Sequence, residues 1–498
     1  MDWWITSDKN IMNLITRAVE LFGNLPMLRM AETTLSFIEC DKRAEKIANN
    51  LVCMGVRAGD SVAIVAPNSG ELLLLLLGLL KGGMIAAPLN CRFPEHLLKK
   101  TVEKLRPRLV VTSDQERFTT VNTATLASML DYPSYDRERD TTLEKSTNPK
   151  FGTVDAMQRP VTIIHTSASS GEAKAALHSF ANHWYNALGS NENIAFGAGD
   201  CWLLSLPLYH IGGYSLLFRS LISGGALALG EPDESLGQSL QNFPLTHLSL
   251  VPTQLYRLLA DQKSKALLRQ LKAVLLGGSA APKSLIECAL REGIPLYLSY
   301  GSTEMGSQIA TTPAPITSAQ QNSGKLLPYR ELSVAKDGEL LVKGPCLFQG
   351  YLQGGIIQPQ TDNDGWFHTS DIGTLSAKNE VTILGRKDNM FISGGENIHP
   401  EEIERALMMI EGIVDALVVP IPDDEYGQRP VAFIQSIEKE KPVEEAIIKS
   451  MQAMVGKLKT PIRYERIKQW VTLPGSQKSD RAWYQKEASA PPRLSLEP

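Results

Sequence analysis

Short apolar runs alternate with longer amphipathic segments along most of the chain. Five strand-like runs lie at residues 161–164, 202–206, 248–251, 273–276 and 296–300, and an amphipathic segment is expected after each. The same rhythm appears earlier, at residues 61–66, 86–89 and 109–112. This rhythm is typical of βαβ units. It predicts an α/β fold with helix-covered, mostly parallel sheets in two similar halves, and ligands beyond the carboxyl ends of the strands.

The pattern changes near residue 385, where a smaller α+β domain is expected. A hairpin-like stretch at 380–384 precedes a helix from about Pro400, strands near 414–420 and 431–435, and a helix over about 443–458. A chain of 498 residues also exceeds what one hydrophobic core organises. We predict a large domain over residues 1–387, a small C-terminal domain over 388–487, a disordered tail over 488–498, and a polar surface connection at 131–159.

Composition limits the partners and the compartment. The chain carries 50 Lys and Arg against 54 Asp and Glu, a net charge of −4, so no basic footprint for nucleic acid is expected. The leucine-rich run at 72–80 is shorter than the roughly 20 apolar residues of a membrane span and predicts a buried core helix. Six scattered cysteines without a C-x-x-C pair suggest neither a zinc site nor a disulfide framework. With an N-terminus unlike a secretion signal, we expect a cytoplasmic protein.

A hydroxyl-rich loop with a lysine follows the run at 161–164. It reads HTSASSGEAKAALH over residues 165–178. Exposed backbone N–H groups, the hydroxyls of Thr166, Ser167, Ser169 and Ser170, and the charge of Lys174 are suited to phosphate, so ATP is the first ligand to consider. Gly171 and Lys174 lack the spacing of the common P-loop, which disfavours a kinase or GTPase. An ordinary polar strand-to-helix turn is the alternative interpretation.

The loop resembles the phosphate loop of the acyl-adenylate-forming superfamily, which includes acyl-CoA synthetases, luciferases and peptide-synthetase adenylation domains. Further motifs match in the same order across roughly residues 30–485: LPLYH at 206–210 with Gly212 and Gly213, LGGS at 276–279, YGSTE at 300–304, GWFHTSD at 365–371, GRKDN at 385–389, SGGENI at 393–398, PEEIE at 400–404, and a late Lys478. The usual loop form is T-S-G-S-T-G-x-P-K. Here Ala168 replaces its first Gly and Ala173 its Pro, so the loop is expected to sit differently or to bind nucleotide more weakly.

The resemblance implies a nucleotide site and a mobile C-terminal domain. Thr166 to Lys174 would cover the β and γ phosphates, Glu304 would ligate Mg²⁺, and Asp371 with Arg386 would hold the ribose. The remaining nucleotide contacts implied are Gly277, Gly278, Ser279 and Tyr300 around the adenine, and Gly301, Ser302 and Thr303 near the α-phosphate. Each residue alone has a structural alternative: Asp371 could cap a turn, and Glu304 could be a solvated acid in the first turn of a helix.

The resemblance also assigns residues to the reaction. Lys478, with Arg481 three residues later, falls at the adenylation lysine, although Gln477 replaces the preceding Gly. Asp388 falls at the hinge on which the small domain would rotate before the thiol of coenzyme A enters, and Gly394 and Gly395 would form the loop for that step. His210 would line and gate the acyl pocket, and a buried hydrogen-bonded core histidine is its alternative.

Within the superfamily the chain most resembles the o-succinylbenzoate:CoA ligases of menaquinone and phylloquinone synthesis. The supporting runs are WLLSLPLYH at 202–210, SLVPTQL at 249–255, KAVLLGG at 272–278 and FISGGENI at 391–398. An aromatic dicarboxylate needs a second cationic anchor, and Arg219 is the candidate, with a surface salt bridge as its alternative role. Another aryl- or fatty-acyl-CoA synthetase, a carrier-loading adenylation enzyme and a non-catalytic nucleotide-binding module remain alternatives. A homodimer is also possible.

Overall fold

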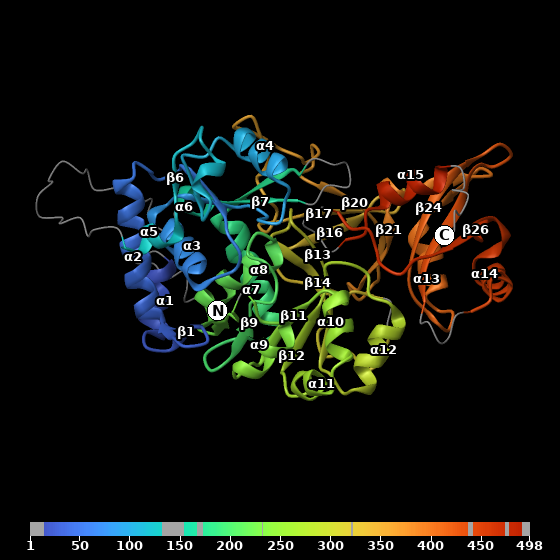
Figure 1. The fold of residues 1–498 in the computed structure, drawn as a ribbon, viewed down its shortest axis with the longest axis horizontal. Helices are drawn as coiled ribbons and strands as arrows, with labels where there is room; N and C mark the ends of the chain where they lie inside the picture. Colours follow the sequence, from blue (N-terminus) through green and yellow to red (C-terminus); the bar gives the residue numbers. More distant parts are fainter. Residues whose placement is uncertain are drawn as a thin grey trace, which may run out of the picture.

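A computed structural model describes residues 14–131, 154–166, 173–231, 233–319, 322–436, 442–473 and 478–490. Two large sheets organise most of the described residues before about 360 (Figure 1). The nine-stranded sheet has the order β15-β14-β13-β12-β11-β9-β10-β1-β2. Its strands are β1 (Pro26–Arg29), β2 (Thr34–Ser36), β9 (Cys201–Leu203), β10 (Ala226–Ala228), β11 (His247–Leu250), β12 (Ala273–Leu276), β13 (Leu296–Ser302), β14 (Ser307–Thr311) and β15 (Lys325–Leu326).

The eight-stranded sheet has the order β19-β18-β8-β7-β4-β3-β5-β6. Its strands are β3 (Ser61–Val65), β4 (Ile85–Pro88), β5 (Leu109–Thr112), β6 (Thr123–Ala124), β7 (Pro160–His165), β8 (Ala175–Ser179), β18 (Gly350–Gln353) and β19 (Ile356–Gln358). Neighbouring strands from β1 through β13 in the first sheet, and β6-β5-β3-β4-β7 in the second, are parallel. The predicted mostly parallel α/β architecture is therefore confirmed.

Helices cover both sheets because their apolar faces need partners. The largest core cluster combines residues of α2 (Phe37–Cys53), α3 (Gly70–Gly82), α7 (Phe180–Asn193) and α8 (Ile211–Ser223) with strands of both sheets, so these helices lie between the sheets. The outer face of the nine-stranded sheet packs on α9 (Leu236–Asn242), α10 (Pro252–Leu259), α11 (Gln262–Leu268) and α12 (Lys283–Arg291), and the outer face of the other sheet packs on α4 (Glu95–Leu105). The remaining helices before residue 160 are α1 (Leu14–Phe22), α5 (Leu126–Asp131) and α6 (Val154–Gln158).

The leucine-rich segment is the buried helix that the sequence predicts. In α3, Ser69 caps the N-terminus by accepting from the Leu72 N–H, every leucine from Leu72 to Leu80 is buried, and Gly83 ends the helix with φ +71°. Among the residues that the structure describes, no helix combines the length and apolar character needed to cross a bilayer.

Two predicted strand-to-helix steps are wrong. The next element after β7 is the antiparallel strand β8, and after β13 it is the antiparallel strand β14. Both partners are five residues long and largely buried, with no clear period that separates a strand from a helix. The hairpin geometry places Thr166 and Lys174 at the end of the β7–β8 pair and Glu304 at the tip of the β13–β14 pair.

A smaller antiparallel sheet has the order β16-β17-β20-β21. It comprises β16 (Glu331–Val334), β17 (Glu339–Lys343), β20 (Phe367–Leu375) and β21 (Val381–Arg386). The elements after residue 390 lie beside this sheet, at the right of Figure 1. They are β22 (Phe391–Ser393), β23 (Glu396–Ile398), α13 (Pro400–Leu407), β24 (Ile413–Asp423), β25 (Gly427–Ser436), α14 (Glu444–Lys459), β26 (Arg463–Arg466) and α15 (Arg481–Ser489).

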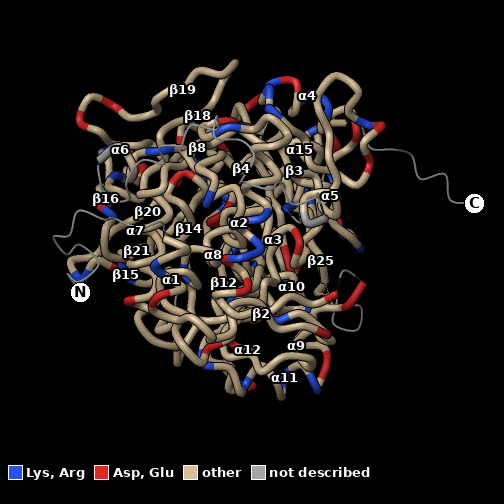
Figure 2. The backbone as a smooth tube through the Cα atoms, turned by 90° about the vertical axis from the view of Figure 1, so that its left-hand side faces the viewer, with Lys and Arg blue, Asp and Glu red and all other residues tan. Residues whose placement is uncertain are grey.

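The C-terminal elements have apolar clusters of their own, formed by β24, β25, α13 and α14 on one side and by β24, β25 and α15 on the other. Ala488 is buried there and Ser489 ends α15, whereas residues 491–498 and most of the predicted connection at 131–159 lie outside the described residues. The boundary at 387/388 remains a proposal. Basic and acidic positions are interspersed along the described chain (Figure 2).

Candidate active site

The loop after β7 brings Lys174 to the edge of the candidate site. The Thr166 N–H donates to the Lys174 carbonyl at 2.9 Å, which closes the base of the loop, and Lys174 lies directly before β8. Ser167, Ser169, Ser170 and Gly171 lie outside the described residues. The Lys174 ammonium is 5.1 Å from the centre of the Tyr351 ring, a cation–π distance.

Glu304 lies in the turn between β13 and β14, not in the first turn of a helix. Its Oε1 accepts a hydrogen bond of 2.6 Å from the Tyr351 hydroxyl. Burial and then the charge of Glu304 raise the pKa of Tyr351, so the phenol stays protonated and donates. Lys174, Tyr351 and Glu304 therefore form one connected group. It joins β8 and β18 of one sheet to β13 of the other.

The glycine-rich segments at the ends of β12 and β13 face each other. Gly277 directly follows β12, and a Cβ added to it would lie 3.5 Å from the Ser299 carbonyl; Gly278 has φ +85°, and Ser279 is exposed. At Gly301 a Cβ would lie 2.1 Å from the Ser307 carbonyl, because β13 and β14 shift register there. Only glycine fits at this position. The Ser302 hydroxyl accepts from the Met305 N–H at 3.3 Å, and the Thr303 carbonyl accepts from the Gly306 N–H.

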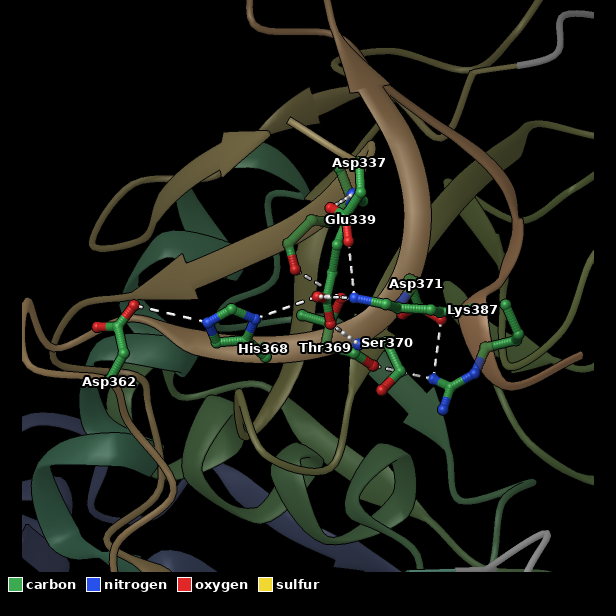
Figure 3. Close-up of polar contacts among 10 residues, drawn as sticks. Asp337, Glu339, Asp362, His368, Thr369, Ser370, Asp371 and Lys387 are labelled. Atoms are coloured by element: carbon green, nitrogen blue, oxygen red, sulfur yellow. Dashed lines mark hydrogen bonds and ion pairs between the residues drawn. The ribbon is translucent and has the colours of Figure 1, made fainter. Parts of the chain in front are cut away.

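Asp371 and Arg386 are register partners on β20 and β21. Arg386 Nη1 donates to Asp371 Oδ1 at 2.9 Å, and the Tyr300 hydroxyl donates to Asp371 Oδ2 at 2.7 Å. Burial, followed by the charge of Asp371, raises the pKa of Tyr300 well above its ordinary value, so this hydroxyl also remains a donor. The carboxylate is thus fixed from two sides beside the end of β13. Asp371 is labelled to the right of the centre of Figure 3.

Lys478 comes from the C-terminal part of the chain and lies within electrostatic reach of the large-domain residues. Burial and then the positive charge of Arg386 lower the pKa of Lys478, while Asp371 and Glu304 act in the opposite direction. The side chain keeps contact with solvent although protein surrounds it on most sides. The segment is held on both sides: the Leu473 N–H donates to the Lys478 carbonyl at 2.9 Å, and Arg481 pairs with Glu404 at 2.8 Å.

His210 is the N-cap of α8 and lies near Lys478. Burial, then the charge of Lys478 and that of Arg92, lower the pKa of His210 to about 4, so the imidazole is neutral at neutral pH. The loop before it is fixed by Asn68, which donates to the Leu206 carbonyl at 3.0 Å and accepts from the Leu208 N–H at 2.8 Å. At Gly213 a Cβ would lie 2.3 Å from the Pro207 carbonyl oxygen. The first turn of α8 can therefore pack against this loop only if residue 213 is glycine.

Arg219 does not form a surface salt bridge. It is 2% exposed, its guanidinium lies 5.3 Å from the Trp202 ring centre, and its Nη2 donates to Gln308 Oε1 and to Ser190 Oγ. Among the described residues, its Nε finds no hydrogen-bond partner, and burial and the like charge of Arg330, with no carboxylate, act on its pKa. The helix rise places Arg219 about 13 Å along α8 from His210.

The predicted hinge residue lies where the chain leaves β21. Asp388 is the middle residue of a 3₁₀ turn, Lys387–Asn389, and its carboxylate accepts from Arg386 Nη2 at 2.9 Å. Across this point Asn389 Nδ2 donates to Glu401 Oε1 of α13 at 2.6 Å. Gly394 and Gly395 form the turn between β22 and β23 with φ of +55° and +84°.

The sequence alone does not indicate Tyr351 or Asn68. Tyr351 lies on a four-residue strand after Gly350, and no periodic pattern relates it to Glu304. Asn68 precedes the N-cap Ser69 and reads as an ordinary turn residue. Both act through contacts with residues at least 47 positions away, which local sequence cannot show.

Two family models match the chain. The AMP-binding enzyme model covers residues 15–352, and the model of the AMP-binding enzyme C-terminal domain covers residues 402–476. The chain belongs to the AMP-binding enzyme family. A relative named 2-succinylbenzoate–CoA ligase from Salmonella typhimurium is 34% identical over 454 residues, 91% of this chain and 92% of the relative. One of the same name from Bacillus cereus is 31% identical over 446 residues, 87% of this chain and 90% of the relative.

Solved structures of this family agree. The Bacillus subtilis o-succinylbenzoate CoA synthetase (MenE) in complex with the acyl-adenylate intermediate OSB-AMP is 26% identical, covers 96% of this chain and 99% of its own, and has a TM-score of 0.82. The wild-type E. coli MenE with a bound m-phenylether-linked analogue of OSB-AMS is 29% identical, with coverage of 95% and 99% and a TM-score of 0.77. The expected superfamily, and the resemblance to o-succinylbenzoate:CoA ligases within it, are confirmed.

Proposed function

We propose that this protein joins o-succinylbenzoate to coenzyme A at the expense of ATP, in menaquinone or phylloquinone biosynthesis. The observation that carries the adenylation chemistry is the position of Lys478, a residue of the C-terminal segment, against Glu304, Asp371 and Arg386 of the large domain. The substrate follows from relatives of that name that match about nine-tenths of the chain.

The nucleotide would lie across the group already described. Lys174 and the loop from Thr166 would cover the β and γ phosphates, Ser302 and Thr303 would lie near the α-phosphate, and Gly277 to Ser279 with Tyr300 would bound the adenine. Asp371, fixed by Arg386 and Tyr300, would accept from the ribose hydroxyls. Glu304 would hold Mg²⁺ together with phosphate oxygens, since Mg²⁺ prefers oxygen ligands, and its Oε2 takes no hydrogen bond from the described residues. The ion supplies positive charge against the phosphates.

In the first half-reaction a carboxylate oxygen of the acid attacks the α-phosphorus of ATP and pyrophosphate leaves. The attack joins two anions, so positive charge held at the point of approach lowers the barrier. Lys478 would supply that charge between the acid and the α-phosphate. His210, neutral at neutral pH, would line the acyl pocket without pairing with the attacking carboxylate. In the second half-reaction the thiol of coenzyme A attacks the acyl carbonyl and AMP leaves, after rotation at Asp388 removes Lys478 and brings in the Gly394–Gly395 turn.

Arg219 would bind the carboxylate that does not react. A buried guanidinium without a carboxylate partner is costly, because burial removes its hydration. Burial and then the charge of Arg330 lower the pKa of Arg219 to about 9, so it remains charged at neutral pH. Its Nε, which bonds to none of the described residues, leaves a donor for an anion. An acid with two carboxylates would place one at Arg219 and the other near Lys478.

The test is an acid panel with ATP and Mg²⁺. Pyrophosphate exchange measures adenylation, and mass spectrometry of the products with coenzyme A present identifies the thioester. We expect exchange with o-succinylbenzoate well above that with monocarboxylic aryl or fatty acids, and a coenzyme A thioester as product. Exchange without thioester formation would indicate a carrier-loading enzyme, and no exchange with any acid would refute catalysis. Fractionation and size-exclusion chromatography would test the cytoplasmic location and the homodimer that we also propose.

A further inference from the structure

A buried carboxylate lies directly behind the proposed ribose clamp. Glu339 begins β17, and its side chain is only 5% exposed. Its Oε1 accepts from the Ser370 N–H at 2.9 Å, and its Oε2 accepts from Lys387 Nζ at 3.0 Å and from His368 Nδ1 at 3.1 Å. Figure 3 shows these donors converging on Glu339 from β20 and from the end of β21.

The bonded residues flank the two members of the clamp. Ser370 immediately precedes Asp371 on β20, and Lys387 immediately follows Arg386 at the end of β21. Asp371 and Arg386 are also register partners, so Glu339 connects the two strands at the position where the clamp forms. The polar partners of the Glu339 carboxylate are His368, Ser370 and Lys387 and not the members of the clamp, so it would act through these neighbours.

The backbone is irregular at this place and needs support. Ser370 has φ +59°, a left-handed conformation that costs a non-glycine residue roughly 1 kcal/mol. The register shifts between Glu339 and Leu341 in the β17–β20 pair and again between Ile372 and Gly373 in the β20–β21 pair. The Glu339–Ser370 bond satisfies an N–H that the irregular ladder leaves without a strand partner.

Glu339 carries a charge that its partners neutralise. Burial alone would raise its pKa, but hydrogen bonds from His368, Lys387 and Ser370 outweigh burial and lower the pKa below the ordinary value. Lys387 is shared with Asp337 at 2.7 Å, and His368 also faces Asp362 at 3.6 Å. The carboxylate is therefore ionised at neutral pH and holds three donors at once.

We propose that Glu339 is a positioning residue for the ribose clamp: by holding Ser370 and Lys387, it fixes Asp371 and Arg386 in the arrangement that binds the ribose hydroxyls. This inference rests on the proposed function, because it needs a nucleotide at Asp371. The same bond to Lys387 anchors the last large-domain residue before the proposed hinge at Asp388.

The test compares ATP with 2′,3′-dideoxy-ATP, which lacks the hydroxyls that the clamp would bind, by calorimetric titration of the full-length protein. Glu339→Gln keeps the size of the side chain and an oxygen for Ser370, but its amide nitrogen cannot accept from Lys387. Glu331→Gln is the matched control, because Glu331 pairs with Lys343 at 3.6 Å on the same sheet and is 61% exposed. Lys387→Met is a second variant that keeps Glu339 and its Ser370 bond.

We expect the wild type and Glu331→Gln to bind ATP at least about tenfold more tightly than the dideoxy analogue, the scale of one hydrogen bond to a charged group. Glu339→Gln should lose most of that preference while binding the dideoxy analogue as the wild type does, and Lys387→Met should lose part of it. If Glu339→Gln weakened the binding of both nucleotides equally, or if Glu339→Gln and Lys387→Met kept the preference for ATP, the role of Glu339 would be refuted but the proposed function would not. A wild type without the preference would instead refute the ribose site of the proposed function, and the inference with it.

Discussion

Replacing Arg219 with methionine should separate substrate binding from stability. At neutral pH the fall of its pKa from 12.5 to about 9 corresponds to about 5 kcal/mol of unfavourable free energy for the buried charge. Methionine removes this cost but leaves Gln308 Oε1 and Ser190 Oγ without their donor, at about 1–3 kcal/mol each. The two effects oppose each other, since the two lost hydrogen bonds cost about 2–6 kcal/mol together, so the unfolding free energy should change by no more than about 3 kcal/mol.

Binding of a dicarboxylate should respond much more strongly. A buried carboxylate that loses its guanidinium costs about 2–5 kcal/mol, so KM for o-succinylbenzoate should rise at least about thirtyfold. A monocarboxylic aryl acid has no second carboxylate for Arg219, so its KM should change by less than about threefold.

The assay is pyrophosphate exchange with both acids, with thermal unfolding of each variant as the measure of stability. Arg291→Met serves as the control, because Arg291 ends the outer helix α12. Equal increases in KM for the two acids would refute the anchoring role. A large loss of stability in Arg219→Met would refute the energy balance.

Three further predictions concern stability and the metal. His178 and His183 are buried, and their ring nitrogens form no hydrogen bond with the described residues. Burial lowers the pKa of His178 to about 3 and that of His183 well below 6.5. In the folded protein both imidazoles therefore stay neutral, whereas in the unfolded chain they take up protons as the pH falls below 6.5. This protonation of the unfolded chain should lower the unfolding free energy at pH 5 by about 2 kcal/mol for each histidine. Urea unfolding of His183→Phe should therefore show a smaller pH dependence than that of the wild type. Gly301→Ala should lower Tm by several degrees in a thermal scan, because its Cβ would meet the Ser307 carbonyl at 2.1 Å, and an unchanged Tm would contradict the close contact. Glu304→Gln should raise the Mg²⁺ concentration needed for half-maximal exchange by about tenfold or more, whereas an unchanged requirement would place the ion elsewhere.

Local sequence sufficed for the regular parts of the fold. Strands at 273–276 and 109–112 were predicted to the residue, because buried parallel strands appear as short apolar runs between turns. The helix from Pro400 was also predicted, since proline fits the first helical position. Strands β8 and β14 were not, because five buried residues carry no period that distinguishes strand from helix.

The site was predicted in part, for a similar reason. Family motifs indicated Glu304, Asp371, Arg386 and Lys478, and the first three act electrostatically on Lys478. Contacts that support them come from residues with no local signal. Glu339 belongs to no motif in the sequence, and the pairing of β17 with β20 buries it.

Lys478 is proposed to serve adenylation and then to withdraw, and the separate half-reactions of Lys478→Ala test this role. Pyrophosphate exchange measures the first half-reaction, and thioester formation from pre-made acyl-adenylate measures the second, with Lys486→Ala on the following helix as the control. We predict that exchange falls by about a thousandfold or more, the scale of losing a preorganised charge at the reacting phosphate, while thioester formation stays within about tenfold of the wild type. Equal loss of both half-reactions, or exchange that is unaffected, would contradict this role of Lys478.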